Sequence, residues 1–259
     1  MAIDKTSVIS NSAKIDSSVE IGPFCIIGDD VEIQSGTSIL SHVVLKGPTV
    51  IGKNNTMYQF STIGEDTPDK KYNGEKTKLL IGDNNIFREG VTVHRGTIQD
   101  KSLTKIGSNN LFMAYAHVAH DCIVGDDNVF ANNAGIAGHV VVGNSVIVGA
   151  LTTVHQFCRL GDHSFAGMNT SINMDVPAYV KVAADPARVI GLNSVGMARN
   201  GIPDESISLL KKSYKVVYKR GLKLEDAIKK LEIMHSETND LFLDTFIQSI
   251  KTSSRGILR

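Results

Sequence analysis

An apolar residue recurs at every sixth position over about two-thirds of the chain. The repeat fills twenty-two of twenty-two slots, where a composition that is 42% hydrophobic would fill about nine. A six-residue period fits neither an α-helix nor a flat strand, and it predicts a hexapeptide β-solenoid. The slots are Ile9, Ile15, Ile21, Ile27, Ile33, Ile39, Leu45, Ile51, Met57 and Ile63, then Ile106, Phe112, Val118, Val124, Phe130, Ile136, Val142, Val148, Val154, Leu160, Ala166 and Ile172.

This period predicts a triangular prism in which three hexads make one coil. Successive coils then stack as parallel strands about 4.8 Å apart. The apolar slot points into the prism, and the residue four positions later is small or β-branched, as at Cys25, Thr37 and Ala116. Glycine often follows the slot, as at Gly107 and Gly125, and we expect a tight corner there to favour a residue without Cβ.

The composition excludes several classes of protein. The net charge is zero, with 27 basic and 27 acidic residues, so the chain lacks the footprint of a nucleic-acid-binding protein. The N-terminal segment lacks the apolar core of a signal peptide, and no apolar run approaches a membrane span, so we expect a soluble, cytoplasmic protein. Cys122 and Cys158 lie two coils apart, about 9.6 Å, which is too far for a disulfide. We expect the cysteines to serve packing.

Two segments interrupt the hexads. The next slot after Ile63 is Ile81, eighteen positions later, and the segment between them is largely polar. The spacing between Val93 and Ile106 is thirteen instead of twelve. Loops on a rigid scaffold often carry binding residues, and the charges in these two segments favour such a role. We predict that the chain leaves the prism in two excursion loops, near residues 64–80 and 94–105.

The chain changes character after about residue 186. From Pro203 onward apolar residues recur at helical spacing, which predicts three helices, near 210–218, 224–234 and 243–250. We therefore predict a β-solenoid domain at 1–186 and a small α-helical domain at 187–259. On the first helix a basic stripe is either a solvated face or a docking surface for an acidic partner; it consists of Lys211, Lys215 and Lys219.

Five of the eight histidines fall in or beside one third of the prism: His94, His117, His120, His139 and His155. A purely structural solenoid would favour Asn, Asp or Ser at exposed corners, so this cluster indicates function. The residues leave two chemistries open. Three neutral imidazoles on adjacent strands could bind catalytic zinc. Alternatively, one imidazole oriented by a carboxylate could act as a general base in acyl transfer. Asp121 follows His120 directly, but neighbours on a strand point to opposite sides, so only a corner conformation lets them meet.

Five segments carry a resemblance to a known family. They are IGEDTPDKKYNGE (63–75), VTVHRGT (91–97), HVAHDCIVG (117–125), NNAGIAGHV (132–140) and VHQFCRLGDHSFAG (154–167). In this order, and followed by a basic helical tail, they resemble the UDP-N-acetylglucosamine O-acyltransferases of lipid A biosynthesis. The resemblance implies a left-handed parallel β-helix with an α-helical C-terminal domain, assembled as a cytoplasmic homotrimer without metal or cofactor. It also implies transfer of an R-3-hydroxyacyl group from acyl carrier protein to the sugar 3-position of UDP-N-acetylglucosamine.

The resemblance assigns roles to matching positions. His120 matches the catalytic base, Asp121 its neighbouring carboxylate, and the backbone amide of Ala150 the oxyanion donor. Met168 occupies the position that limits acyl-chain length, and the basic stripe becomes the docking surface for acyl carrier protein. The positions that match substrate-binding residues are Asp69, Lys71, His94, His117, His139, His155, Gln156, Asn193 and Arg199.

Two departures from the family's common pattern leave questions open. Val195 stands where many members have an acidic residue, and Asn200 where they often have a second arginine, so nucleotide contacts are expected to differ in detail. The native acyl chain, and the choice between a 3-hydroxyl and a 3-amine acceptor, stay open. The alternatives are a hexapeptide acyltransferase that uses another nucleotide sugar or acetyl-coenzyme A, a zinc-dependent hydratase on the same fold, and a non-catalytic solenoid.

Overall fold

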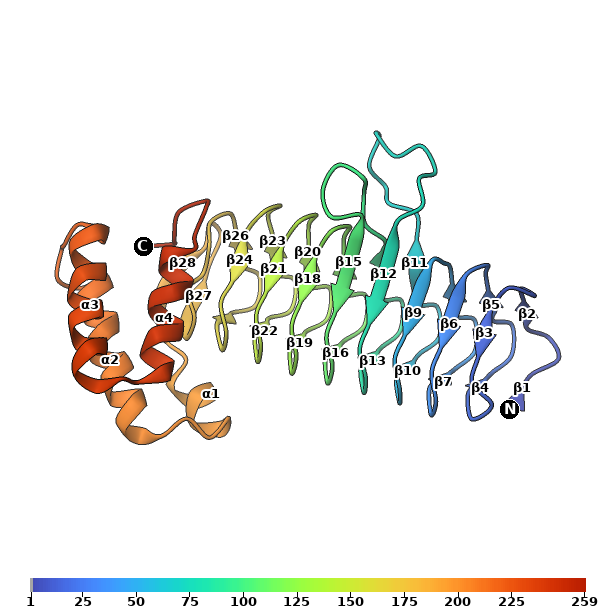
Figure 1. Ribbon diagram of the computed structural model, residues 1–259, viewed down its shortest axis with the longest axis horizontal. Helices are drawn as coiled ribbons and strands as arrows, with labels where there is room; N and C mark the ends of the chain where they lie inside the picture. Colours follow the sequence, from blue (N-terminus) through green and yellow to red (C-terminus); the bar gives the residue numbers. More distant parts are fainter. Residues whose placement is uncertain (1) are drawn as a thin grey trace.

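The computed structural model describes residues 2–259, and in them the hexads build a long three-sided prism that ends in a helical cluster (Figure 1). Each full coil contributes one short strand to each of three sheets, named A, B and C here. Residues eighteen apart pair in register, as Val118 does with Ile136 and Ile136 with Val154. The parallel stacking predicted from the six-residue period is confirmed.

Strands of the same sheet follow one another at every third element. Sheet A contains β1 (Ala2–Ile3), β4 (Glu20–Ile21), β7 (Ser38–Ile39), β10 (Thr56–Met57), β13 (Ile86–Phe87), β16 (Leu111–Phe112), β19 (Val129–Phe130), β22 (Ile147–Val148), β25 (Phe165–Ala166), β27 (Val180–Ala183) and β28 (Arg188–Leu192). Sheet B contains β2 (Val8–Ile9), β5 (Ile26–Ile27), β8 (Val44–Leu45), β11 (Thr62–Glu65), β14 (Thr92–His94), β17 (His117–Val118), β20 (Gly135–Ile136), β23 (Thr153–Val154) and β26 (Ser171–Ile172). Sheet C contains β3 (Lys14–Ile15), β6 (Val31–Ile33), β9 (Thr49–Ile51), β12 (Lys78–Ile81), β15 (Leu103–Ile106), β18 (Ile123–Val124), β21 (Val141–Val142) and β24 (Arg159–Leu160).

The interior of the prism is filled by the predicted apolar slots. Every slot from Ile21 to Ile172 is buried, and only Ile9 and Ile15, near the N-terminal end, are partly buried. The cysteines are buried and free, and burial raises the pKa of the Cys122 thiol to about 12. The thiol therefore stays protonated at neutral pH, which supports a packing role.

Most corners of the prism use a left-handed backbone conformation three residues after the slot. Between sheets B and C this position is occupied by Asp121 (φ 58°), His139 (φ 65°) and Phe157 (φ 66°) in successive coils. The glycines that follow the slots lie two positions earlier, and the expectation that a residue without Cβ is favoured there agrees with the close approach of the next coil. A Cβ on Gly107 would lie 2.7 Å from the carbonyl oxygen of Gly125 in the next coil, so these glycines permit close stacking of coils.

Both predicted excursion loops leave the prism at the corner between sheets B and C. The first loop spans residues 66–77, between β11 and β12, and the second spans 95–102, between β14 and β15. They project next to each other from one edge of the prism (Figure 1). Because both loops interrupt the same corner, they stand beside the column that contains Asp121 and His139.

The C-terminal part is helical, as predicted. The three expected helices are α2 (Asp204–Tyr218), α3 (Leu224–Thr238) and α4 (Leu241–Lys251), and a short helix, α1 (Ser194–Arg199), precedes them. β28 pairs antiparallel with β27, although it lies beyond the domain boundary predicted at residue 186. The exact division between the two domains stays a prediction. Within residues 2–259, no helix has both the length and the apolar character needed to cross a membrane.

Candidate active site

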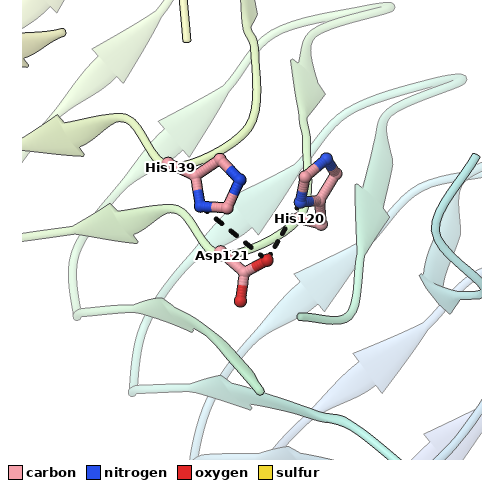
Figure 2. Close-up of side chains that lie close together, drawn as sticks. All are labelled: His120, Asp121 and His139. Atoms are coloured by element: carbon pink, nitrogen blue, oxygen red, sulfur yellow. Dashed lines mark hydrogen bonds and ion pairs between the residues drawn. The ribbon is translucent and has the colours of Figure 1, made fainter. Parts of the chain in front are cut away.

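The side chains of His120 and Asp121 meet at the corner after β17. Asp121 is fully buried, and the His120 side chain is 15% exposed, with 2.9 Å between His120 Nδ1 and Asp121 Oδ2 (Figure 2). The left-handed conformation of Asp121 turns the chain so that these consecutive side chains converge. The sequence analysis required a corner conformation for these two side chains to meet, and the structure has that corner.

The Asp121 carboxylate is held by donors from the second loop. The Thr97 N–H lies 3.0 Å from both carboxylate oxygens, and the Thr97 hydroxyl donates to Oδ2 at 2.6 Å. Although burial raises the pKa of Asp121, hydrogen bonds from His120 and Thr97 hold that pKa below its usual value. An ionised carboxylate can only accept, so His120 donates through Nδ1. In the neutral imidazole, Nε2 then keeps its lone pair.

His139 lies one coil beyond His120, and their ring centroids are 5.0 Å apart in an edge-to-face arrangement. The opposite face of His139 stacks on Phe157 at 4.4 Å. His139 Nδ1 is 2.8 Å from Asp100 Oδ2 and 4.0 Å from Asp121 Oδ2. Single ligand atoms of His120, Asp121 and His139 lie within 4.8 Å of one another, which is close enough for a metal. However, Asp121 Oδ2 already accepts from Thr97 and His120, which makes it a poor metal ligand.

His94 and His117 form a second imidazole pair on sheet B. Their ring centroids are 5.2 Å apart, and His117 Nδ1 is 2.7 Å from the Thr92 hydroxyl. Burial, with a smaller effect of nearby His117, lowers the pKa of His94 to about 4. Burial and nearby His120 also lower the pKa of His117. Both rings are therefore neutral at pH 7.

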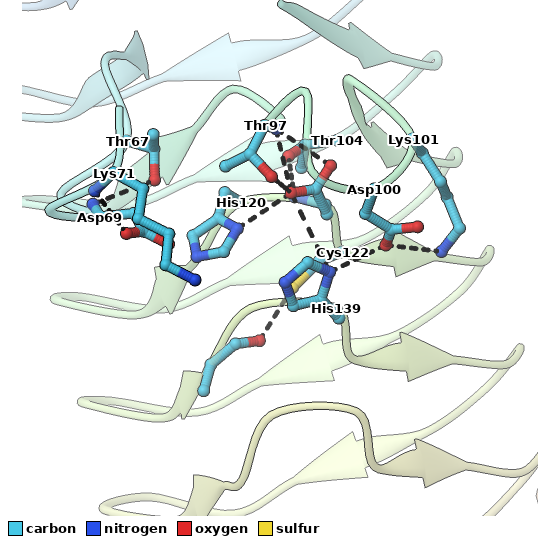
Figure 3. A network of polar contacts seen from close by, with 12 residues as sticks. Thr67, Asp69, Lys71, Thr97, Asp100, Lys101, Thr104, His120, Cys122 and His139 are labelled. Atoms are coloured by element: carbon cyan, nitrogen blue, oxygen red, sulfur yellow. Dashed lines mark hydrogen bonds and ion pairs between the residues drawn. The ribbon is translucent and has the colours of Figure 1, made fainter. Parts of the chain in front are cut away.

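Two neighbouring cavities open beside these histidines. One, of about 420 Å³, is lined by His117, His120 and Asp69. The other, of about 580 Å³, is lined by Asp69, Lys71 and His139, together with Gln156 from the next coil. Asp69 belongs to both cavities, and Figure 3 shows it with Lys71 on the first loop, beside His120. Six of the predicted catalytic or substrate-binding residues thus line these two cavities, and predicted Asp121 and His94 contact His120 and His117 beside them.

Other predicted residues lie apart from this group within one chain. His155 is exposed, and its Nδ1 is 3.1 Å from the Gln156 carbonyl oxygen. Ala150 and Met168 lie at the corner between sheets A and B, whereas His120 lies at the corner between sheets B and C. A single chain therefore does not place the Ala150 amide beside His120.

The two predicted nucleotide contacts lie at α1. Asn193 is buried and caps this helix, because its Oδ1 accepts from the Gly196 N–H at 3.1 Å. Its Nδ2 donates to the His163 carbonyl at 3.0 Å. Arg199 is exposed. The Asn193 side chain therefore has a structural role, while the Arg199 guanidinium is accessible.

Two residues of the site escaped the sequence analysis. Thr97 lies in a loop without periodicity, so nothing in its position indicated contact with Asp121. Gly138 supports the His120 ring, because a Cβ there would lie 2.6 Å from His120 Cε1 and 2.7 Å from Nε2. The Gly138–His139 pair was visible in the sequence, but only the stacking of adjacent coils shows that glycine is needed.

The hexapeptide prism and its oriented imidazole at the mouth of a cavity define a hexapeptide-repeat transferase. Residues 103–138 match a family model described as bacterial transferase hexapeptide, and residues 175–258 match one described as UDP-N-acetylglucosamine O-acyltransferase, domain 2. A Pseudomonas putida protein named acyl-[acyl-carrier-protein]–UDP-N-acetylglucosamine O-acyltransferase is 52% identical over 258 residues, covering 100% of this chain and 99% of its own. The chain belongs to the UDP-N-acetylglucosamine O-acyltransferase family.

Solved structures agree with this membership. UDP-N-acetylglucosamine O-acyltransferase from Moraxella catarrhalis is 45% identical with a TM-score of 0.96, and LpxA from Acinetobacter baumannii is 47% identical with a TM-score of 0.97. Each match covers 100% of both chains. The predicted left-handed parallel β-helix with a small helical C-terminal part is confirmed.

Proposed function

We propose that this protein transfers an R-3-hydroxyacyl chain from acyl carrier protein to the sugar 3-position of UDP-N-acetylglucosamine, the first step of lipid A biosynthesis. Full-length relatives that carry the corresponding enzyme name are 52% and 50% identical to it. The observation that carries the proposal is the His120–Asp121 pair, because its geometry leaves Nε2 as a base beside a cavity.

In the proposed reaction, His120 Nε2 removes the proton from the sugar 3-hydroxyl as its oxygen attacks the thioester carbonyl. The new carbon–oxygen bond forms a tetrahedral oxyanion, which collapses and expels the phosphopantetheine thiolate. The protonated His120 then returns the proton to that thiolate. Asp121 stabilises the imidazolium between the two transfers. Atoms and charge balance without a metal or a covalent enzyme intermediate.

The oxyanion needs a backbone N–H donor. The sequence assigns this role to Ala150, and its position at a different corner means that the amide would come from another subunit. Gly138 is a second candidate, because its backbone lies against the His120 ring in the same chain. The donor assignment to Ala150 stays a prediction.

The remaining assignments extend this proposal. The residues that line the cavities, Asp69, Lys71, His117, His139 and Gln156, bind the sugar and the pantetheine arm. Arg199 contacts the nucleotide, the predicted contact Asn193 acts by capping the helix that carries Arg199, and His94 and His155 border the cleft. Acyl carrier protein docks on α2, and the active assembly is a homotrimer. The cytoplasmic location predicted from the sequence stays a prediction.

The test is substitution of the base. His120→Ala should lower acyl transfer by about two to four orders of magnitude while the thermal unfolding midpoint stays near that of wild type. His235→Ala, which removes a half-buried imidazole on α3 that lines neither cavity, is the matched control. Activity of His120→Ala within a few-fold of wild type would overturn the mechanism.

The same assay separates the rival activities. Mass spectrometry of products from UDP-N-acetylglucosamine, its 3-amino analogue, acyl carrier protein thioesters and acetyl-coenzyme A identifies both acceptor and donor. Faster reaction with acetyl-coenzyme A than with every carrier thioester would favour the acetyltransferase alternative. Hydratase activity that is lost on zinc chelation would favour the metalloenzyme.

A further inference from the structure

The second excursion loop, residues 95–102, contacts both imidazole–carboxylate pairs of the site. Thr97 contacts Asp121, which pairs with His120, and Asp100 contacts His139 (Figure 3). Neither Thr97 nor Asp100 has a role in the chemistry proposed above. Both contacts nevertheless act on groups within 5.0 Å of one another at the reacting centre.

Thr97 determines how Asp121 faces His120. Its N–H and hydroxyl supply three contacts of 2.6–3.0 Å to the carboxylate, and Asp121 is fully buried, so the carboxylate has little freedom to rotate. The hydroxyl and His120 Nδ1 share one acceptor, Oδ2. Hydrogen bonds to a buried charged acceptor are the stronger kind, so the hydroxyl fixes the oxygen that orients the base.

Asp100 determines which carboxylate His139 uses. A neutral imidazole has a single N–H, and His139 Nδ1 lies 2.8 Å from Asp100 but 4.0 Å from Asp121 Oδ2. Without Asp100, the nearest carboxylate to His139 Nδ1 among the described residues is Asp121. His139 would then compete with His120 for the same oxygen.

The loop is itself held firmly. The Arg95 side chain is buried and donates to the Gly64 carbonyl, to Asp66 and, at 3.0 Å, to the Tyr72 hydroxyl of the first loop. The Ser102 N–H closes the second loop by donating to the Thr97 carbonyl at 2.9 Å. A segment fixed at both ends can hold two carboxylates in place with little further loss of entropy.

We propose that the second loop is a positioning segment for the catalytic imidazoles: Thr97 holds Asp121 toward His120, while Asp100 keeps His139 away from Asp121. Thr97 and Asp100 act through other residues, so they are positioning residues. The inference rests on the proposed role of His120 as the base.

The experiment compares steady-state kinetics of Thr97→Val, Thr97→Ser and Asp100→Ala. Thr97→Val, which keeps the side-chain shape and the backbone donor, should lower kcat about tenfold or more with unchanged KM for UDP-N-acetylglucosamine. Thr97→Ser, which restores a hydroxyl, should stay within a few-fold of wild type. Asp100→Ala should also lower kcat about tenfold. Thr37→Val is the matched control, because Thr37 is equally buried and hydrogen-bonds only main-chain groups of the adjacent coil, Gly52 and Asn55.

A second comparison separates positioning from general damage to the fold. In the His120→Ala background, Thr97→Val and Asp100→Ala should cause no further loss of the residual rate, because both act on the His120–Asp121 contact, which is absent there. A normal kcat in both variants, or losses that add fully to that of His120→Ala, would overturn the inference alone. Full activity of His120→Ala itself would overturn the base assignment and this inference together.

Discussion

At the scale of single residues, the site depends on one backbone conformation that recurs at most corners of the prism. Asp121 has φ 58° because it occupies the third position after the slot at Val118, and this conformation lets it meet His120. Aspartate and asparagine tolerate left-handed backbone better than most residues, so the corner can carry a functional carboxylate at low cost. The proposed catalytic pair therefore uses a backbone conformation that the repeat already supplies.

The sequence predicted those site residues that lie on the repeat better than those that lie on loops. His120 and His139 are nineteen residues apart, and this spacing correctly places them in adjacent coils. Thr97 and Asp100 lie in an insertion, where no period relates sequence distance to position. Their contacts with Asp121 and His139 required the folded loop to be seen.

Met168 gives the first residue-scale prediction. Its side chain is 70% exposed, and it follows Ala150 by one coil at the corner between sheets A and B. If this corner forms the acyl groove, the methionine shortens it, and each methylene left unburied costs about 0.8 kcal/mol. We expect donors of about ten to twelve carbons to be favoured over fourteen. At this free energy per methylene, a difference of a few methylenes corresponds to roughly a hundredfold difference in rate. Met168→Gly should extend the preference by several carbons.

Competition between thioesters of ten to sixteen carbons, followed by mass spectrometry, measures this preference. Met168→Leu, which keeps an apolar side chain of similar volume, should retain the wild-type preference. Equal rates for ten- and fourteen-carbon donors in wild type, or an unchanged preference in Met168→Gly, would place the length limit elsewhere.

His94 gives the second residue-scale prediction, which concerns stability. Its pKa is lowered to about 4 by burial, with His117 contributing, so between about pH 6.5 and 4 the unfolded chain binds a proton that the folded chain does not. The free energy of unfolding should therefore fall as the pH falls through this window. His94→Asn removes this buried imidazole, so the free energy of unfolding of the variant should fall less than that of wild type over the same pH range.

Thermal unfolding midpoints at pH 7, 6, 5 and 4 test this linkage, with His235→Asn as the control that removes a half-buried imidazole on α3. The difference between His94→Asn and wild type should become more favourable to the variant toward pH 4. Parallel pH curves for the two proteins would show that His94 does not couple folding to protonation.

At the scale of elements, strong periodicity was sufficient to predict the strands of the prism and the three long helices. The elements that were missed, α1 and β28, have no such periodicity. The strands and the three long helices each bury a repeating apolar face. The helix α1 has six residues and includes Gly196, so it is too short for a helical period and depends on the Asn193 cap. β28 pairs with β27 across a turn instead of continuing the hexads, so it lay outside the repeat.

The basic stripe on α2 gives the element-scale prediction. Lys211, Lys215 and Lys219 are all exposed, while Val216 and Val217 on the same helix are buried. Exposed charges act mainly on the encounter with a partner of opposite charge, and salt screens them. Reversal of the three lysines to glutamate should raise KM for acyl carrier protein thioesters several-fold at low ionic strength.

The KM for UDP-N-acetylglucosamine should stay unchanged in this variant, and added salt should reduce its difference from wild type. Reversal of Lys229 and Lys230, which are exposed on α3, is the control for charge alone. A donor KM equal to that of wild type at low ionic strength would mean that the stripe is only a solvated face.

At the scale of the whole molecule, the corner between sheets A and B exposes apolar side chains along the prism. Phe24, Phe60, Tyr115 and Leu151 each occupy the left-handed position of this corner, and each is more than half exposed. Gly90 and Asn133 occupy this position in two intervening coils, but large exposed apolar side chains that recur along one edge still indicate an interaction surface. The predicted acyl-groove residues Ala150 and Met168 lie at the same corner, away from His120.

These two observations lead to one prediction about assembly. If Ala150 supplies the oxyanion donor, a complete site needs the corner that carries His120 and the corner that carries Ala150, and a cyclic arrangement of chains brings such different corners together. We expect light scattering to give the mass of about three chains of 28.0 kDa each. Tyr115→Asp with Leu151→Asp should dissociate the trimer and abolish transfer although His120 is intact. Ile233→Asp, which changes an exposed apolar side chain on α3, should leave both mass and activity unchanged. A fully active monomer would contradict the shared site.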